Sequence, residues 1–205
     1  MDHLYKIYDL NFDVDLLKQE VLKLLKDNPW TDVNSQQLAL QYGETPGYFN
    51  DLDRGYGTGQ RLENEITNWN TELEDSYIKE CVYKVHPNPS GARIMILGEG
   101  ECYPTHVDGF KNRYQIPVFT IPPLDYWVFP KDEVVFSMEP GKAYWLNTHA
   151  LHSYVSGTAA PRINIIFNDV DDVLDTSPQE TEEFLKYREM ITANKEAIDE
   201  VYNHR

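Results

Sequence analysis

Two segments decide the predicted fold of this chain: residues 93–123, RIMILGEGECYPTHVDGFKNRYQIPVFTIPP, and residues 144–168, YWLNTHALHSYVSGTAAPRINIIFN. In and between them, short runs of β-branched and aromatic residues alternate with Gly and Pro turns, which is typical of strands. The strand candidates are residues 93–97, 114–120, 126–129, 134–138, 143–146 and 163–167. Many short strands at this spacing predict a double-sheet jelly roll or a sandwich.

The first segment contains His106 and Asp108, and the second contains His152. On an extended strand, residues i and i+2 point to the same face, so His106 and Asp108 could bind one ion together. A His from a neighbouring strand would complete a set of two imidazoles and one carboxylate. That set is the facial triad of non-haem Fe(II) oxygenases, and its open positions could take O₂ and an organic co-substrate.

Arg162 lies ten residues after His152 and is predicted on the following strand. Its planar guanidinium could pair bidentately with a carboxylate. This placement suits the distal carboxylate of 2-oxoglutarate, whose keto-acid end would chelate the iron. His149 is a rival to His152 as a metal ligand. The spacing to Arg162 favours His152, and an odd separation of three places His149 on the other face of a regular strand.

The pattern of an HxD pair, a distal His and an Arg ten residues later resembles the Fe(II)/2-oxoglutarate-dependent oxygenases. In detail it is similar to the aspartyl/asparaginyl β-hydroxylase-like branch, including the small members carried by phages and marine bacteria. The resemblance covers roughly the middle half of the chain and is supported by residues 93–97, 102–104, 113–118, 144–148 and 162–165. It implies a mainly β fold with flanking helices, the double-stranded β-helix or cupin-like jelly roll.

The resemblance also implies a role for each site residue. The implied metal ligands and catalytic residues are His106, Asp108 and His152, and the implied co-substrate-binding residues are Arg162, Arg113, Gln115, Asn164 and Tyr103. Arg113 could instead be a surface partner for nearby acids. Gln115 stands where many relatives have a His, and Asn164 where the broader superfamily often has a Ser. Asn164 can still donate a hydrogen bond to the co-substrate.

The activity implied is that of a 2-oxoglutarate-dependent dioxygenase, a hydroxylase with Fe(II) as its metal and 2-oxoglutarate and O₂ as co-substrates. Its substrate would be an amino-acid side chain, free or in a peptide or protein, with Asp, Asn and Pro as first candidates. Succinate and CO₂ would be the co-products. Two alternatives stay open: a catalytically silent jelly-roll protein that binds a metal or ligand, and a cupin-type enzyme that does not use 2-oxoglutarate and has no need of Arg162.

Composition narrows the classes of partner and compartment. The net charge of −16 repels phosphate backbones, so direct nucleic-acid binding is disfavoured and a small-molecule or peptide substrate is expected. Two Cys without a CxxC motif favour a reducing compartment. With no signal peptide and no apolar run of membrane-spanning length, the sequence predicts a cytoplasmic protein of a bacterium or of a phage-infected host.

The 205 residues are predicted to form a single domain with three parts. Residues 1–91 are expected to be a helical and loop region, with an edge strand in residues 1–12, helices over 13–28 and 71–85, and a loop over 43–59 that is a lid, a substrate-recognition segment or a plain surface loop. Residues 92–170 are the predicted jelly-roll core with the metal site. Residues 171–205 are a predicted C-terminal helix that packs outside the sheet or forms a dimer contact.

Overall fold

The computed structural model describes residues 3–29, 37–44, 46–47, 65–109 and 112–172. These residues belong to one compact unit, Met1–Leu174. The predicted C-terminal helix and most of the predicted loop over residues 43–59 lie outside the described residues. Among the described helices, none combines the length and the apolar character needed to cross a membrane.

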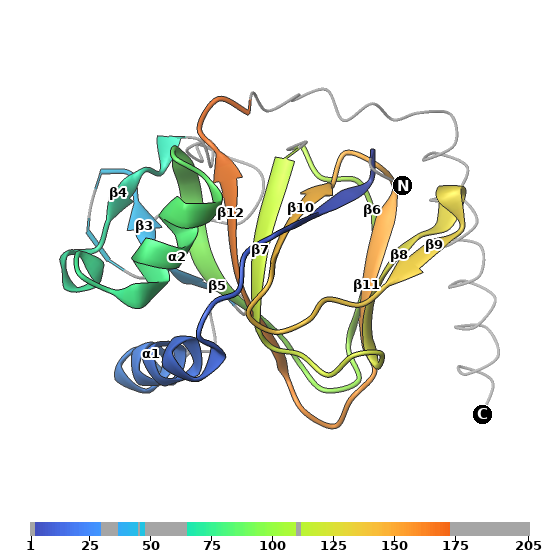
Figure 1. Ribbon diagram of the computed structural model, residues 1–205, viewed down its shortest axis with the longest axis horizontal. Helices are drawn as coiled ribbons and strands as arrows, with labels where there is room; N and C mark the ends of the chain where they lie inside the picture. Colours follow the sequence, from blue (N-terminus) through green and yellow to red (C-terminus); the bar gives the residue numbers. More distant parts are fainter. Residues whose placement is uncertain (1–2, 30–36, 45, 48–64, 110–111, 173–205) are drawn as a thin grey trace, which may run out of the picture. The chain divides into compact units, whose positions relative to one another are not determined.

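The described strands form two main antiparallel sheets and a short ribbon (Figure 1). The six-stranded sheet has the order β1 (Tyr5–Tyr8), β10 (Ala143–Asn147), β7 (Asn112–Phe119), β12 (Arg162–Asp169), β5 (Pro89–Leu97) and β2 (Gln37–Ala39). The four-stranded sheet has the order β6 (Cys102–His106), β11 (His152–Ser156), β8 (Asp125–Phe129) and β9 (Val134–Phe136). The ribbon pairs β3 (Gln41–Tyr42) with β4 (Asn68–Trp69).

From β5 onward the chain passes repeatedly between the two main sheets. Strands β5, β7, β10 and β12 lie in the six-stranded sheet, and β6, β8, β9 and β11 lie in the four-stranded sheet. This alternation between two sheets is that of a jelly roll, so the predicted fold class is confirmed. The first segment of the chain adds β1 at one edge of the larger sheet, where it pairs with β10, as predicted.

The central strands of the larger sheet, β7, β12 and β5, are buried on both faces over most of their length. On β12, Ile163, Ile165 and Phe167 belong to the apolar cluster that also contains the buried side chains of the two helices. The alternate residues, among them Arg162 and Asn164, face the other way, because successive side chains of a strand point to opposite faces. A second apolar cluster, which includes Trp127, Tyr144 and Tyr154, is formed by strands of both sheets.

Two helices lie on the side of the larger sheet away from the smaller one (Figure 1). Helix α1 (Val14–Asp27) is amphipathic, buries Leu17 and Val21, and begins at Asp13, whose carboxylate accepts hydrogen bonds from two backbone N–H groups of the first turn. Its bounds confirm the prediction of a helix over residues 13–28.

The second predicted helix begins later than expected. A 3₁₀ turn (Thr71–Leu73) precedes helix α2 (Tyr77–Val85), so residues 71–85 are not one continuous helix. The break lies at Ser76, which is extended and whose Oγ accepts a hydrogen bond from the N–H of Lys79, an N-cap that starts a new helix. Helix α2 buries Ile78, Cys81, Val82 and Val85.

Candidate metal centre

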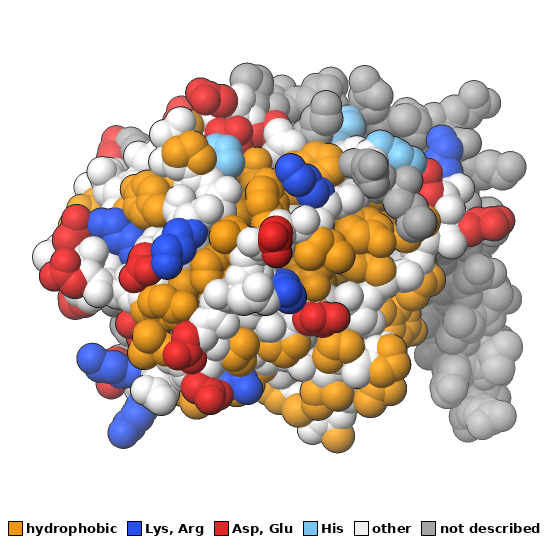
Figure 2. Space-filling view, viewed as in Figure 1, with side chains coloured by type: hydrophobic (Ala, Val, Ile, Leu, Met, Phe, Trp, Pro, Cys, Tyr) orange, Lys and Arg blue, Asp and Glu red, His pale blue; other side chains and the backbone are white. Residues whose placement is uncertain are grey.

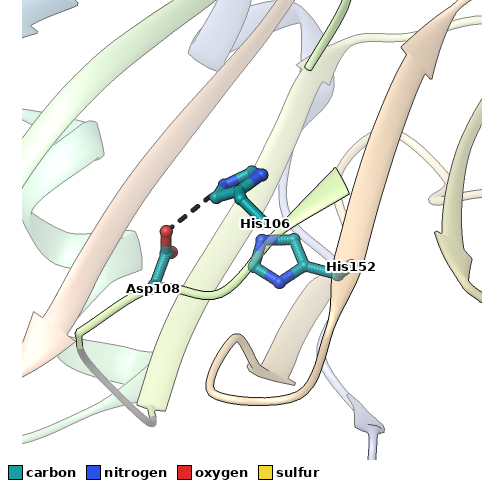
Figure 3. Close-up of side chains that lie close together, drawn as sticks. All are labelled: His106, Asp108 and His152. Atoms are coloured by element: carbon teal, nitrogen blue, oxygen red, sulfur yellow. Dashed lines mark ion pairs between the residues drawn. The ribbon is translucent and has the colours of Figure 1, made fainter. Parts of the chain in front are cut away.

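Strand pairing brings the two histidines of the predicted site together. Strands β6 and β11 are antiparallel neighbours, and His106 and His152 are direct partners across the pair. Their imidazole rings lie 4.4 Å apart between centroids (Figure 3). Residues far apart in the sequence therefore share one site because the jelly roll places β6 beside β11.

Asp108 belongs to this site, but it is not positioned by the strand geometry that the sequence predicted. Strand β6 ends at His106, so Asp108 lies beyond it and the i, i+2 rule for strands does not place its side chain. The backbone N–H of Asp108 donates to the carbonyl of Thr148, 2.9 Å away, which ties the turn after β6 to the turn before β11. One ligand atom each from His106, Asp108 and His152 then lies within 4.8 Å of the others.

Each imidazole presents Nε2 to the site because its Nδ1 is already engaged. His106 Nδ1 lies 2.7 Å from the carbonyl oxygen of Pro104, and His152 Nδ1 lies 2.9 Å from that of Ala150. A carbonyl can only accept, so Nδ1–H donates in both contacts and Nε2 is the nitrogen left to face the site. Metal-binding histidines are commonly oriented in this way.

The protonation states of Asp108 and His152 also suit a metal site. Burial by itself would raise the pKa of the Asp108 carboxyl, but the Arg113 guanidinium and the two histidines outweigh it and hold that pKa well below its usual range. Burial lowers the pKa of His152 to about 4, so this imidazole is neutral at neutral pH. Burial opposes charge on His106 too, but its hydrogen bond and attraction to Asp108 raise its pKa. Deprotonated carboxylate and neutral imidazole are the forms that bind metals.

The donor set fits an Fe(II) ion that keeps open positions, since two imidazole nitrogens and one carboxylate oxygen make the facial triad. His149, the rival ligand, precedes β11 and is not part of the metal-ligand group found among the described residues.

A buried cation lies beside this centre. Arg162 is 5% exposed, and its Nη2 donates to Gln115 Oε1 at 2.8 Å. Its Cζ atom lies 3.6 Å from the ring centroid of Tyr154, so the guanidinium rests on an aromatic face. Among the described residues no carboxylate forms an ion pair with Arg162. A buried charge without a counter-ion is costly, which makes this position attractive for an anionic ligand.

Gln115 and Asn164 adjoin Arg162. Gln115 Oε1 accepts a second hydrogen bond from Asn164 Nδ2 at 2.7 Å, so one carbonyl oxygen holds both neighbours. Asn164 Oδ1 is buried and has no hydrogen-bond partner in the described part of the chain. Tyr103 lies near the triad, with its ring 6.2 Å from that of His106.

Two further aromatic residues of the site were missed from the sequence. Tyr154 carries Arg162 on its ring, and Trp127 lies 5.3 Å from the His152 ring and 6.0 Å from Arg162 Cζ. Trp127 and Tyr154 are direct cross-strand partners on β8 and β11. The signal for Tyr154 was available, because it stands two residues after His152 and therefore shares its face. Trp127 could only be found once the pairing of β8 with β11 was known.

Comparison with known proteins places the fold in a class. No family model matches the chain, and no curated protein sequence matches it. The fold is similar to that of a solved prolyl hydroxylase structure.

One similar structure is the viral collagen prolyl hydroxylase vCPH from Paramecium bursaria Chlorella virus-1 in its 2OG complex. It is 11% identical, with 80% of this chain and 94% of that chain covered and a TM-score of 0.50. A Trichoplax adhaerens prolyl hydroxylase bound to a hypoxia inducible factor peptide fragment is 15% identical, with coverage of 82% and 84% and a TM-score of 0.49. At 11% identity the likeness to the viral enzyme shows the fold alone.

Proposed function

We propose that this protein is an Fe(II)- and 2-oxoglutarate-dependent oxygenase that hydroxylates an amino-acid side chain, free or in a peptide or protein, with succinate and CO₂ as co-products. The observation that carries the proposal is Arg162, a buried guanidinium without a carboxylate partner among the described residues. A metal triad alone would fit several kinds of enzyme. The triad together with an unpaired buried cation fits a co-substrate that has a carboxylate at its far end.

Each residue then has a stated task. His106 Nε2, His152 Nε2 and the Asp108 carboxylate would hold Fe(II). When bound, the iron and its co-substrates supply the oxidising chemistry, while the protein supplies position and a site shielded from water. The nearby Trp127 and Phe129 rings give His152 an apolar surrounding.

Arg162 would bind the distal carboxylate of 2-oxoglutarate. Gln115 occupies one guanidinium nitrogen and Tyr154 covers one face, so the orientation of the fork is fixed before the ligand arrives. A fixed fork loses little conformational freedom on pairing with a carboxylate, which favours bidentate binding. Asn164, held by the same Gln115 oxygen, and Tyr103 are proposed to complete this pocket.

The substrate class rests on resemblance. The HxD-His-Arg pattern resembles the aspartyl/asparaginyl β-hydroxylase-like branch, and the solved structures of similar fold include prolyl hydroxylases, one of them bound to a peptide. Side chains of Asp, Asn and Pro are therefore the substrates to screen first, both as free amino acids and within peptides.

The proposal is tested by anaerobic titration of the Fe(II)-loaded protein with 2-oxoglutarate, following the weak visible metal-to-ligand charge-transfer band. Wild type is expected to develop the band, His106→Ala to lose it, and Arg162→Ala to need more 2-oxoglutarate to reach it. Bound iron without a band in wild type would contradict the proposal and favour a cupin-type or purely binding role. Substrates would then be screened by succinate release.

A further inference from the structure

The two oxygens of the Asp108 carboxylate have different neighbours. Oδ1 lies 3.4 Å from Nε2 of His106, another member of the metal-ligand group (Figure 3). Oδ2 lies 3.1 Å from Arg113 Nη2, which donates a hydrogen bond to it. We propose that Arg113 is a positioning residue that keeps Oδ2 away from the metal, so that Asp108 binds through Oδ1 alone. This inference rests on the proposed function.

Arg113 is built to hold a fixed position. It lies on β7, in the interior of the larger sheet, with Leu146 of β10 as its partner on one side and Asn168 of β12 on the other. Its side chain is 7% exposed. The Asp108 main chain is fixed separately, through the hydrogen bond of its N–H to the Thr148 carbonyl. The carboxylate is therefore held at its backbone by one contact and at its outer oxygen by another.

Whether the carboxylate binds the ion through one oxygen or through two decides how many coordination positions remain for other ligands. A six-coordinate ion that takes two imidazoles and one carboxylate oxygen keeps three positions for other ligands. A bidentate carboxylate would occupy a fourth position and leave two. A keto acid that chelates through two atoms would then fill the ion completely, and no position would remain for dioxygen.

The contact gives Arg113 a role distinct from the co-substrate binding expected from the sequence. A charge-assisted hydrogen bond between a guanidinium and a carboxylate is short and directional. It constrains which oxygen faces the ion, a task that an apolar side chain of similar volume cannot perform. Outer partners of metal ligands commonly affect metal affinity or activity about 10- to 100-fold.

Nitric oxide, a stable stand-in for dioxygen, tests the inference on the Fe(II)-loaded protein. Its affinity is measured anaerobically by the electron paramagnetic resonance signal of the iron–nitrosyl, first without and then with saturating 2-oxoglutarate. Wild type is expected to bind nitric oxide in both states. Arg113→Met is expected to bind it normally without 2-oxoglutarate but about 10- to 100-fold more weakly with it.

Two further variants sharpen the result. Arg113→Lys keeps a cation and a donor for Oδ2, so its nitric oxide affinity should stay close to that of wild type in both states. Arg93→Met is the matched control, because it removes another buried Arg from the same sheet, one that donates to the backbone carbonyl of Gly91. It should bind nitric oxide as wild type does in both states.

The outcomes separate this inference from the proposed function. If Arg113→Met binds nitric oxide equally well in both states, or if Arg113→Lys holds iron and 2-oxoglutarate but not nitric oxide, the positioning role is overturned while the proposed function stands. If wild type shows no charge-transfer band with 2-oxoglutarate, the proposed function itself fails, and the role of Arg113 fails with it.

Discussion

At the scale of single residues, hydrogen bonds within the protein orient the polar side chains of the site before any ligand binds. The two imidazoles have their Nδ1 atoms on carbonyls, and Arg162 has one nitrogen on Gln115. The sequence predicted His106, Asp108, His152 and Arg162 as a group because their spacing carries the signal. It could not predict that Arg113 would contact Asp108, because that contact depends on how β7 lies relative to the turn after β6.

Gln115→Leu should weaken 2-oxoglutarate binding about fivefold to tenfold, because Arg162 and Asn164 both lose their shared acceptor and one net hydrogen bond is worth about 1 kcal/mol. The metal affinity should not change, since Gln115 makes no hydrogen bond to the triad among the described residues. Calorimetry on the Mn(II)-loaded protein measures both constants.

A matched control for this variant is Gln41→Leu. Gln41 is also a buried glutamine, but it bonds to the backbone of Thr67, Pro89 and Ala92. The Gln41→Leu substitution is expected to lower the free energy of unfolding without changing the affinity for 2-oxoglutarate. Equal 2-oxoglutarate affinities in wild type and Gln115→Leu would show that Gln115 does not position Arg162.

His152 should make the metal-free protein less stable in mild acid. The folded pKa is about 4, below the ordinary 6.5, so the unfolded chain binds a proton that the folded chain does not. The stabilising contribution is fully present above pH 6.5 and is lost as the pH falls toward 4, by about 3 kcal/mol at most. The raised pKa of His106 acts above this window, and the lowered pKa of Asp108 acts below it.

Urea unfolding in the presence of a chelator, at pH 7 and at pH 4.5, checks this prediction. Wild type should lose free energy of unfolding between the two pH values, and His152→Asn should lose distinctly less. An unchanged loss in the variant would assign the acid sensitivity to other groups.

At the scale of elements, segments with a clear periodic or β-branched run were predictable, even the three-residue strand β9. Strands β6 and β11, which carry the two histidines, were not among the strand candidates. Helix α1 and strands β5, β7, β8, β10 and β12 follow clear periodic or β-branched runs. Strands β2, β3 and β4 are only two or three residues long, too short for any period to show, and they form through pairing with distant partners. The start of α2 was placed too early because the apolar pattern continues through the 3₁₀ turn.

Helix α2 has a second cap that no local sequence signal reveals. The Glu20 carboxylate of α1 accepts hydrogen bonds from the N–H groups of Tyr77 and Ile78, each at 2.9 Å. It satisfies free N–H groups and places negative charge at the positive end of the helix.

Glu20→Ala should therefore lower the free energy of unfolding by about 1–2 kcal/mol. Glu20→Gln keeps one acceptor and loses the charge, so its free energy of unfolding should lie between those of wild type and Glu20→Ala. Urea unfolding at pH 7 measures all three values. A loss for Glu20→Ala no larger than that for an exposed Glu72→Ala would argue against the cap.

At the scale of the whole molecule, the two faces of the larger sheet differ: one packs the apolar core and the other carries polar residues of the site. Its helix-facing side carries an extensive apolar cluster, which buries Ile163, Ile165 and Phe167 of β12. Its other side can therefore present charged and amide groups such as Arg113 and Arg162 without losing the packing that stabilises the fold. The fold class followed from the strand pattern, but which polar residues meet inside it follows only from the strand order.

On the face shown in Figure 2, Lys and Arg side chains are scattered among acidic and apolar ones in the described part of the chain. The net charge of −16 is the basis of the prediction that nucleic acid is not a direct partner, and that prediction stays untested.

The central claim is that Arg162 recognises a distal carboxylate. The most direct test compares the dissociation constants of 2-oxoglutarate and 2-oxopentanoate, which has the same chain length but no distal carboxylate, for Mn(II)-loaded wild type and Arg162→Met. We expect wild type to prefer 2-oxoglutarate about 10- to 100-fold, the value of a charge-assisted hydrogen-bonded pair, and Arg162→Met to show almost no preference. An equal preference in both proteins, or none in wild type, would contradict the claim.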